Sequence, residues 1–436
     1  MSTSKPWKVM HLELSEGIST LPLTPGYGGL YVVFWWKGIP LGHQNILAAQ
    51  LPMPATQLAN LALQAIAPAV SNHLLGECFQ APLRELPKHR QENVLPKFYA
   101  LVALGQPLAM LEQRLTQRKP ERELVSVVVC TRERPESLAR CLRSLQSLSR
   151  PPHEILVVDN APTSNATQQV VSQMPGIRYV LEPRPGLGKA RNTGIRCSTG
   201  NIIAFTDDDV EVHPDWLTRL QQHFDDPKIM VVTGLVLPAE LETEAQLIFE
   251  KDLGYLNKGY RPKTFDSQFF ERTKNLGAPV WEVGAGANMA MRREVFDLVG
   301  DFDERLGAGA AGCSDDSEFW CRVLAEGWNC RYEPTSVVYH YHRSDLDDLR
   351  RQMYQYFRGH VAALLFQFAR YRHWGNLRSL FWSLPMYYAG LLIIGLLRGF
   401  EPRNQTYLAE KISGCLAGIK FYLQNQDSDK RLQKHT

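Results

Sequence analysis

Three consecutive aspartates end a short apolar run in the segment NIIAFTDDDV (201–210). The run is partly β-branched and aromatic, which predicts a buried strand that leads into Asp207, Asp208 and Asp209. Adjacent carboxylates beside an apolar strand are costly without a partner. Because Mg²⁺ and Mn²⁺ prefer carboxylate oxygens together with substrate phosphates, the aspartates predict half of a divalent-cation site. The alternative is a solvated acidic loop, whereas an EF-hand is excluded because Val212 stands where its loop needs glycine.

A basic, glycine-containing segment, RPGLGKARNTG (184–194), lies just before this strand. Gly186 and Gly188 permit a tight turn whose amides can approach an anion, and Lys189 and Arg191 suit phosphate or acidic partners. The segment is neither a P-loop nor a dinucleotide fingerprint, because glycines that those motifs require are missing. An ordinary turn and helix start is an equal alternative.

A second acidic cluster occurs in GCSDDSEFWCRVLAEG (312–327), which has the pattern of an amphipathic helix with Ser314 or Asp315 as N-cap. A helix start lowers the pKa of a carboxyl such as Asp316, and a neighbour such as Asp315 or Glu318 raises it again. Such a cluster can supply a general base that deprotonates a hydroxyl. Helix capping alone is the alternative for one or two of these carboxylates.

Two histidines follow in VVYHYH (337–342), which is predicted to be a strand. Alternation along a strand puts His340 and His342 on one face. Either imidazole could bind the predicted metal or a phosphate, and a hydrogen-bonded structural histidine is the alternative for each.

These side chains need a common framework, and the chain between them alternates strands and helices. The expected strands are 125–130, 154–158, 177–181 and 202–205, and the expected helices are 135–148, 168–174 and 188–197. Such alternation implies βαβ units and a largely parallel sheet. Ligands of such sheets bind beyond the carboxyl ends of the strands, which is where Thr131-Arg132, Asp159-Asn160 and the three aspartates fall.

The first 112 residues carry no catalytic signature. Residues 28–42 predict a β-hairpin with a turn at Lys37-Gly38, and residues 56–75 predict a helix, so we expect a small α+β module. The charged stretch 113–123 is predicted to be a linker.

Composition excludes several classes of protein. The net charge of +3 gives no general affinity for nucleic acid, and the N-terminus MSTSKPWKVM lacks the apolar core of a secretory signal. The eight cysteines contain no CxxC pair, which argues against zinc sites and a disulfide framework. We therefore expect a chain that faces the cytosol, with reduced cysteines.

The C-terminal part is predicted to be helical and increasingly apolar from about Asp345. Leu380 to Leu397 carries no formal charge and is bounded by Arg378 and Arg398, close to the length of a membrane span. Basic residues at both ends favour a helix in the membrane interface. A buried core helix and a true span are the alternatives.

Taken in order, these motifs resemble the family 2 glycosyltransferases of GT-A fold over roughly Leu124 to Ser344. The segments that carry the resemblance are VSVVVCTRERP, EILVVDNAP, GLGKARNTGI, IIAFTDDDV, GAGANMAMRREVFDLVGDFDERL and SDDSEFWCRVLAEGWNCRYEPTSVVYH. The resemblance implies a Rossmann-like, mixed but mainly parallel sheet flanked by helices. It divides the chain into an N-terminal module (1–112), a linker (113–123), a catalytic domain (124–344) and a C-terminal helical region (345–436).

The resemblance also implies a role for each matching residue. The nucleotide sugar is assigned to Thr131, Arg132, Glu133, Asp159, Gly188, Lys189, Arg191, Asp207 and Asp208. The metal is assigned to Asp209 and Asp207, and the residues themselves add His340 as a weaker candidate. Asp316 is the implied catalytic base. Asn288, Asp315 and Glu318 are placed on the side of the acceptor and the transferred sugar, with Asp315 standing where the family has glutamate.

The implied reaction is metal-dependent transfer of a hexose-like sugar from a nucleotide-diphosphate sugar to an acceptor hydroxyl, with inversion, in cell-surface glycan, glycolipid or polysaccharide assembly. Asp159 suits a pyrimidine, which favours a UDP- or dTDP-sugar donor, and the acceptor is expected to be a glycan or lipid-linked molecule at the inner face of a membrane. No QxxRW stretch is present, which argues against a processive synthase. The alternatives are a nucleotidyltransferase, disfavoured by the glycine-free CTRERPESL, and a degenerate sugar-nucleotide-binding scaffold.

Overall fold

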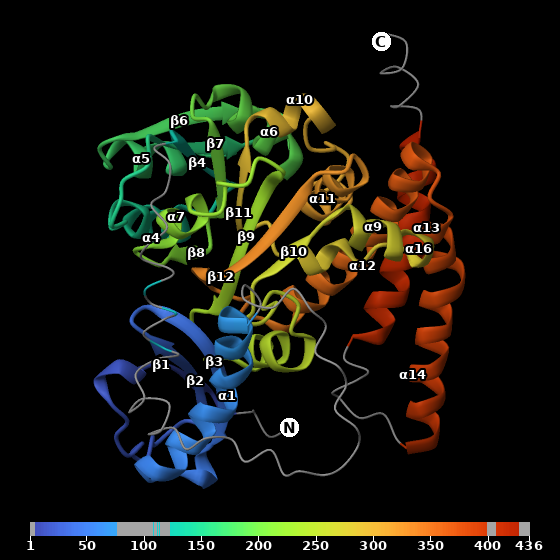
Figure 1. The fold of residues 1–436 in the computed structure, drawn as a ribbon. Coiled ribbons are helices and arrows are strands. Elements are labelled where there is room, and N and C mark those ends of the chain that lie inside the picture. Colours follow the sequence, from blue (N-terminus) through green and yellow to red (C-terminus); the bar gives the residue numbers. More distant parts are fainter. Residues whose placement is uncertain are drawn as a thin grey trace.

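The computed structural model describes residues 5–75, 108, 111, 113, 123–398 and 407–426. Most of the predicted linker 113–123 lies outside these residues. Figure 1 shows a small N-terminal sheet with its helix, a central sheet covered by helices on both faces, and a group of C-terminal helices along one side.

The central sheet contains the strands expected from the sequence and several more. In chain order these are β4 (Val125–Thr131), β5 (Glu154–Asn160), β6 (Ile177–Glu182), β7 (Ile202–Asp207), β8 (Val210–Val212), β9 (Ile229–Pro238), β10 (Lys263–Phe265), β11 (Asn288–Arg292) and β12 (Asn329–His340). Their order across the sheet is β10-β12-β9-β11-β7-β4-β5-β6, with β8 paired to β12. β4, β5, β6, β7, β9 and β12 run in one direction, whereas β8, β10 and β11 run against them. The predicted mixed, mainly parallel α/β fold is therefore confirmed.

Helices bury both faces of this sheet. The helices in this part of the chain are α4 (Pro135–Gln146), α5 (Ala166–Ser172), α6 (Leu187–Cys197), α7 (Trp216–Gln221), α8 (Glu244–Leu247), the π-helix η3 (Ile248–Leu253), α9 (Ser267–Thr273), α10 (Glu294–Val299), α11 (Asp315–Ala325) and the short 3₁₀ helices η4 (Lys274–Leu276) and η5 (Val280–Val283). Alternate residues of β4 enter two cores: Val128 packs with Phe319 of α11, while Val127 and Val129 pack with Leu142 of α4. Burial on both faces explains why the central strands read as unbroken apolar runs.

The N-terminal module packs tightly against the central sheet. Its strands are β1 (Trp7–Glu13), β2 (Gly29–Trp36) and β3 (Ile39–Leu47), preceded or followed by the 3₁₀ turns η1 (Leu14–Glu16) and η2 (Ala48–Gln50), and its helix is α1 (Ala55–Leu75). The predicted hairpin and helix are confirmed, and Lys37 and Gly38 turn the chain with positive φ. One face of β2, with Phe34, packs on α1, and the other, with Trp35, packs on Leu235 and Val337 of the central sheet. β2 is thus an interior strand of the whole molecule.

The C-terminal region is helical, as predicted. It contains α12 (Leu346–Tyr371), α13 (Trp374–Arg378), the π-helix η6 (Ser379–Ser383), α14 (Leu384–Arg398) and α16 (Leu408–Gln424). α16 packs closely on α12. A Cβ at Gly418 would lie only 2.5 Å from the carbonyl oxygen of Arg358. The short approach requires glycine at this point of the helix pair.

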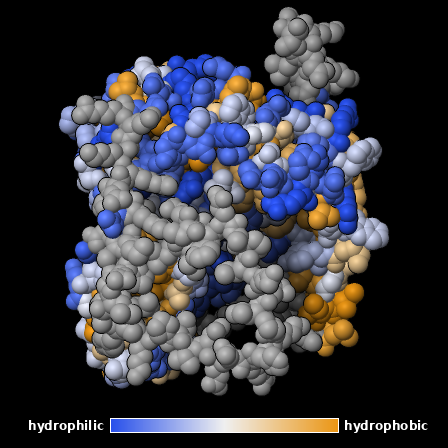
Figure 2. Space-filling view, in the orientation of Figure 1, coloured by the Kyte–Doolittle hydropathy of each residue, from blue (hydrophilic) through white to orange (hydrophobic). Residues whose placement is uncertain are grey.

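α14 leaves most of its apolar surface uncovered. Leu396 is 75% exposed and Leu397 is 79% exposed, and an apolar patch lies at this end of the molecule in Figure 2. The interpretation of 380–397 as a buried core helix is therefore wrong. In the described part of the chain, one helical stretch, Trp374–Leu397, is long and apolar enough to cross a bilayer.

Candidate active site

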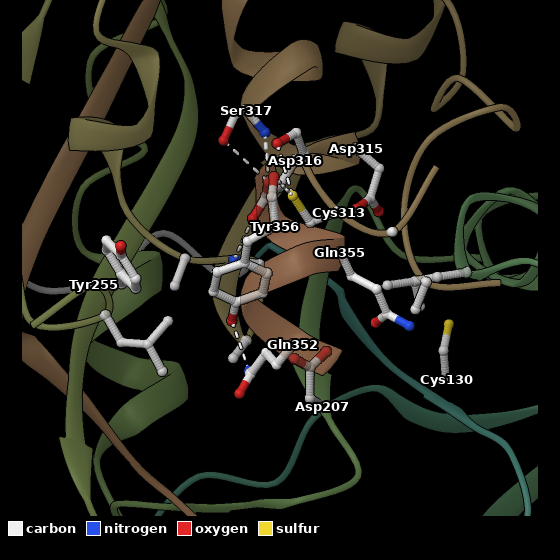
Figure 3. Close-up of a pocket in the computed structure, with 18 of the residues that line it drawn as sticks. Cys130, Asp207, Tyr255, Cys313, Asp315, Asp316, Ser317, Gln352, Gln355 and Tyr356 are labelled. Carbon is white, nitrogen blue, oxygen red and sulfur yellow. Dashed lines mark hydrogen bonds between the residues drawn. The ribbon is translucent and has the colours of Figure 1, made fainter. Parts of the chain in front are cut away.

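A cavity of about 800 Å³ opens at the carboxyl ends of the parallel strands (Figure 3). Side chains from the strand ends, from α6, from α11 and from α12 meet there. Its polar wall includes Thr131, Arg132, Arg134, Asn160, Arg191, Asp207, Asp208, Asp209, Lys258, Asp315, Asp316, His340, Arg343, Gln352 and Gln355. The sheet register brings the strand ends together, since Cys130 lies beside Asp207 and Thr131 beside Asp159.

The three aspartates diverge from the end of β7. The hydroxyl of Thr131 donates to Asp208 at 2.7 Å. One guanidinium nitrogen of Arg134 donates to both Asp208 and Asp209, at 3.0 Å each. Asp207 points into the cavity with its side chain about a third exposed. Thr131 and Arg134 thus hold Asp208 and Asp209 in place beside the cavity. The sequence assigned Thr131 to the site but did not indicate Arg134.

Positive charge is distributed unevenly around these carboxylates. Burial raises the pKa of Asp207 to about 7, helped by the charges of Asp209 and Asp208 and opposed by Arg191. Burial also raises the pKa of Asp208. The pKa of Asp209 is lowered, because His340 and two arginines outweigh the opposing effect of burial. A cation that bound beside Asp207 would stabilise its charged form.

Arg191 links the two acidic clusters. It is almost fully buried, donates to Asp315 at 2.6 Å, and has its other terminal nitrogen 3.6 Å from Asp207. Burial raises the pKa of Asp315, and Arg191 opposes this effect. The guanidinium predicted to contact a phosphate therefore joins α6 to α11 through an ion pair between residues far apart in the sequence.

Asp316 faces the cavity at the start of α11. One carboxylate oxygen accepts from the backbone amide of Gly286 at 2.8 Å, and the other accepts from the amide of Ser317 at 2.6 Å and from its hydroxyl at 3.2 Å. A Cβ at Gly286 would lie 2.7 Å from Arg191 and 2.9 Å from Asp316. Ser314 occupies the expected N-cap position, although its hydroxyl makes no capping bond. Glycine at 286 thus allows an amide to hold Asp316 in place.

The two histidines lie side by side, as the predicted alternation required. His340 lines the cavity with its Nε2 3.4 Å from a carboxylate oxygen of Asp209, and its Nδ1 is 2.9 Å from Nδ1 of His342. Burial lowers the pKa of His340 to about 4, against the pull of Asp209. His340 thus faces Asp209 at the cavity, and His342 lies behind it in the protein interior.

Two residues assigned to the acceptor side lie in the core instead. Asn288 is fully buried; it accepts from the indole of Trp216 at 2.8 Å and donates to two backbone carbonyls. Glu318 is buried against Arg322, which donates to it at 3.0 Å. Both side chains are fully engaged away from the cavity, so neither is placed to touch an acceptor. The sequence pattern did not predict the burial of these two polar side chains.

Several residues assigned to the nucleotide lie beside the cavity rather than in its wall. Asp159 is buried and accepts from Tyr179 at 3.0 Å, and burial raises its pKa. Glu133 is exposed and holds the backbone amides of the Thr163-Ser164 turn. Gly188 packs on the backbone of Asp303, and Lys189 is half-buried outside the cavity lining. By contrast, Thr131 and Arg132, also assigned to the nucleotide, line the cavity at the end of β4.

The opposite side of the cavity is largely apolar and was not foreseen. It is formed by Tyr255, Leu256, Trp281, Tyr356, Phe357 and Leu384. Figure 3 shows Tyr255 and Tyr356 facing the space beside the acidic residues. Lys258 lies in the same wall, and burial lowers its pKa. The residues of this wall come from the loop after η3 and from η5, α12 and α14, segments with no catalytic pattern in the sequence.

Comparisons with known proteins point to one family. Residues 126–300 match the family model "Glycosyl transferase family 2". A pre-mycofactocin glycosyltransferase of Mycobacterium tuberculosis is 28% identical over 230 residues, which cover 52% of this chain and 45% of that protein. The succinoglycan biosynthesis protein ExoM of Rhizobium meliloti is 30% identical over 230 residues, covering 49% and 66%. The glycosyltransferase AglE of Haloferax volcanii is 24% identical over 294 residues, covering 66% and 84%.

The match thus spans about half the length of the mycobacterial relative. Among solved structures, the mannosyltransferase PcManGT of Pyrobaculum calidifontis, in complex with GDP-Man and Mn²⁺, aligns with a TM-score of 0.46 at 18% identity, over 74% of this chain and 96% of that one. The residues matched by the family model include the strand ends and the three aspartates, whereas α11 and α12 lie beyond them. Residues 126–300 therefore form a segment of the glycosyl transferase family 2 type.

Proposed function

We propose that this protein transfers a sugar from a nucleotide-diphosphate sugar to an acceptor hydroxyl, with inversion at the anomeric carbon. The observation that carries the proposal is the presence of two distinct acidic clusters in one cavity, Asp207 to Asp209 and Asp315-Asp316 (Figure 3). A cavity of about 800 Å³ is in the usual range for small-molecule sites. The match to the family model supports the same reading.

The donor half is formed by the strand ends and the aspartates. Arg132 and Arg134 supply positive charge there. Asp207 and Asp209, together with the imidazole of His340, fit a divalent cation such as Mn²⁺ or Mg²⁺, because the charge of Asp207 is incompletely balanced. No set of three histidine, cysteine or acidic side chains among the described residues could hold a metal alone. The site therefore fits a metal that binds together with a diphosphate, where it would neutralise charge on the leaving group.

The acceptor half is organised around Asp316. Its carboxylate, held by Gly286 and Ser317, removes the proton from an acceptor hydroxyl. The hydroxyl oxygen forms a bond to the anomeric carbon on the face opposite the diphosphate, and the bond to the diphosphate breaks with its electron pair. Arg191 pairs with Asp315 and opposes its protonation, so that Asp316 is the carboxylate of this cluster that takes up the proton.

The apolar wall favours an acceptor with an apolar part. Trp281, Tyr356 and Leu384 line the cavity beside Asp316, and Leu384 begins α14. The exposed apolar face of α14 and the arginines that bound it fit a helix in the interface of an anionic membrane. A lipid-linked acceptor at the inner face of the membrane explains both features. The choice of a pyrimidine nucleotide through Asp159 stays a prediction, since that carboxylate lies behind the cavity wall.

The proposal is tested by thermal unfolding with a panel of nucleoside diphosphates, with Mn²⁺ or with chelator, on the wild type and on Asp209→Asn. A ligand that binds only the native state stabilises it by about 2.7 kcal/mol at a hundredfold excess over Kd. We expect a Mn²⁺-dependent increase in Tm for one nucleotide, which the variant loses. No increase with any nucleotide would contradict the donor site.

A second measurement separates the proposed reaction from nucleotidyl transfer. A glycosyltransferase releases a nucleoside diphosphate from the sugar donor, whereas a nucleotidyltransferase releases pyrophosphate from a nucleoside triphosphate. Product analysis with both substrates distinguishes the two reactions. Release of pyrophosphate alone would overturn the proposal.

A further inference from the structure

A row of hydrogen-bonded side chains runs from the N-terminal module to His340, which lies beside the aspartates. Tyr31 on β2 donates to one carboxylate oxygen of Glu250 at 3.1 Å. The other oxygen of Glu250 lies 3.1 Å from Nε2 of His342. Nδ1 of His342 lies 2.9 Å from Nδ1 of His340, whose Nε2 is 3.4 Å from Asp209. The row therefore runs from residue 31 to the proposed metal site.

The chemistry of each group sets the direction of these hydrogen bonds. A carboxylate at Glu250 only accepts, so the Nε2–H of His342 must donate to it. When Nε2 carries the only ring proton of His342, its Nδ1 accepts from the Nδ1–H of His340. His340 is left with its lone pair on Nε2, directed at the side of Asp209. Two acceptors then face each other there without a proton between them, which is a suitable arrangement for a bound cation.

The middle of the row is buried, which limits the exchange of protons between its imidazoles and water. The side chain of His342 is 1% exposed and that of Glu250 is 7% exposed. The ring of Phe249 lies 4.7 Å from that of His342, between centroids. Tyr31 is buried on the face of β2 that packs with Leu235, Leu237 and Val337 of the central sheet. The hydrophobic contact between the modules thus fixes the tyrosine that starts the row.

We propose that Tyr31 and Glu250 are positioning residues that hold His340 in the tautomer able to bind the metal, so that the N-terminal module forms part of the donor site. Hydrogen bonds from outer groups fix ring orientation and tautomer at metal-binding histidines in general. The inference rests on the proposed function, because it requires a metal at Asp209. It assigns a role to a part of the chain that the family match does not cover.

The decisive variant is Glu250→Gln. A glutamine keeps its carbonyl for Tyr31 but offers an N–H to Nε2 of His342, which reverses each later hydrogen bond. His342 then donates to His340, and Nε2 of His340 becomes protonated. We expect Mn²⁺ affinity in the presence of a nucleoside diphosphate, measured on the full chain from the free Mn²⁺ signal in electron paramagnetic resonance, to fall about 10- to 100-fold. Tyr31→Phe should weaken it by a smaller factor.

A direct readout needs no metal. Nitrogen chemical shifts of labelled histidine distinguish Nδ1–H from Nε2–H tautomers, and the signal of His340 is identified by its loss in His340→Ala. The wild type should show the Nδ1–H form of His340, and Glu250→Gln should show the Nε2–H form. An Nε2–H tautomer in the wild type would overturn the inference.

Controls separate this inference from simpler explanations. Tyr27→Phe removes a tyrosine hydroxyl of the same module that lies 3.4 Å from Glu242, outside the row, and should bind Mn²⁺ like the wild type. Glu250→Gln should cost nothing further in the background of His340→Ala. Wild-type Mn²⁺ affinity in Glu250→Gln, with reduced affinity in His340→Ala, would overturn this inference and leave the proposed metal site standing. Wild-type affinity in Asp209→Asn would overturn the proposed metal site itself.

Discussion

At the scale of single residues, Asp315 and Asp316 are adjacent in sequence and different in setting. Asp315 is paired with the buried Arg191, whereas Asp316 faces the cavity. We therefore expect Asp316→Asn to retain binding of donor nucleotide and metal while turnover falls by ~10²-fold or more. Calorimetric binding and steady-state kinetics on the same preparation test this. Turnover close to the wild type would remove Asp316 as the base.

The ion pair of Arg191 and Asp315 gives a prediction about stability. Arg191→Met leaves Asp315 as a buried charge without its partner, and breaking such a pair costs roughly 3–5 kcal/mol. Urea denaturation should show this loss, and Asp315→Asn in the same chain should recover part of it. A double variant as unstable as the sum of the two single variants would show that the pair is not coupled.

At the scale of elements, the alternation of apolar runs and helical periodicity was sufficient to predict β4 to β7 and the helices between them. It placed the three strand ends at one edge, and the register confirms this for β4, β5 and β7. It did not reveal that Asn288 and Glu318 point into the core, because neighbours distant in sequence decide that. It also missed the apolar wall from α12 and α14, whose role depends entirely on tertiary packing.

The packing of α16 on α12 is testable in the same way. Gly418→Leu would force a side chain against the backbone of Arg358, and overpacking of this kind typically costs about 1–3 kcal/mol. The matched control is Leu416→Ala on the same helix, where the leucine is largely exposed and its loss should change little. Thermal unfolding of the two variants distinguishes them, and equal Tm values would contradict close packing at Gly418.

At the scale of the whole molecule, α14 lies along the outer side of the protein (Figure 1), and most of its apolar side chains are exposed. If this surface enters a membrane interface, the protein should float with anionic liposomes in a density gradient. Replacing Phe381, Trp382 and Leu397, which are all exposed, with serine should abolish flotation without lowering Tm. A wild-type protein that stays at the bottom of the gradient would exclude this membrane contact.

The double-sided burial of β2 has a consequence for how the chain is made. The face of β2 that carries Trp35 finds its partners on β9 and β12, which leave the ribosome long after the N-terminal module has been synthesised. Until then an apolar, aromatic sheet face has nothing to cover it and is open to aggregation. This protein therefore most depends on a chaperone while its nascent N-terminal module is still without β9 and β12. Slowing synthesis before β9 should lower its soluble yield.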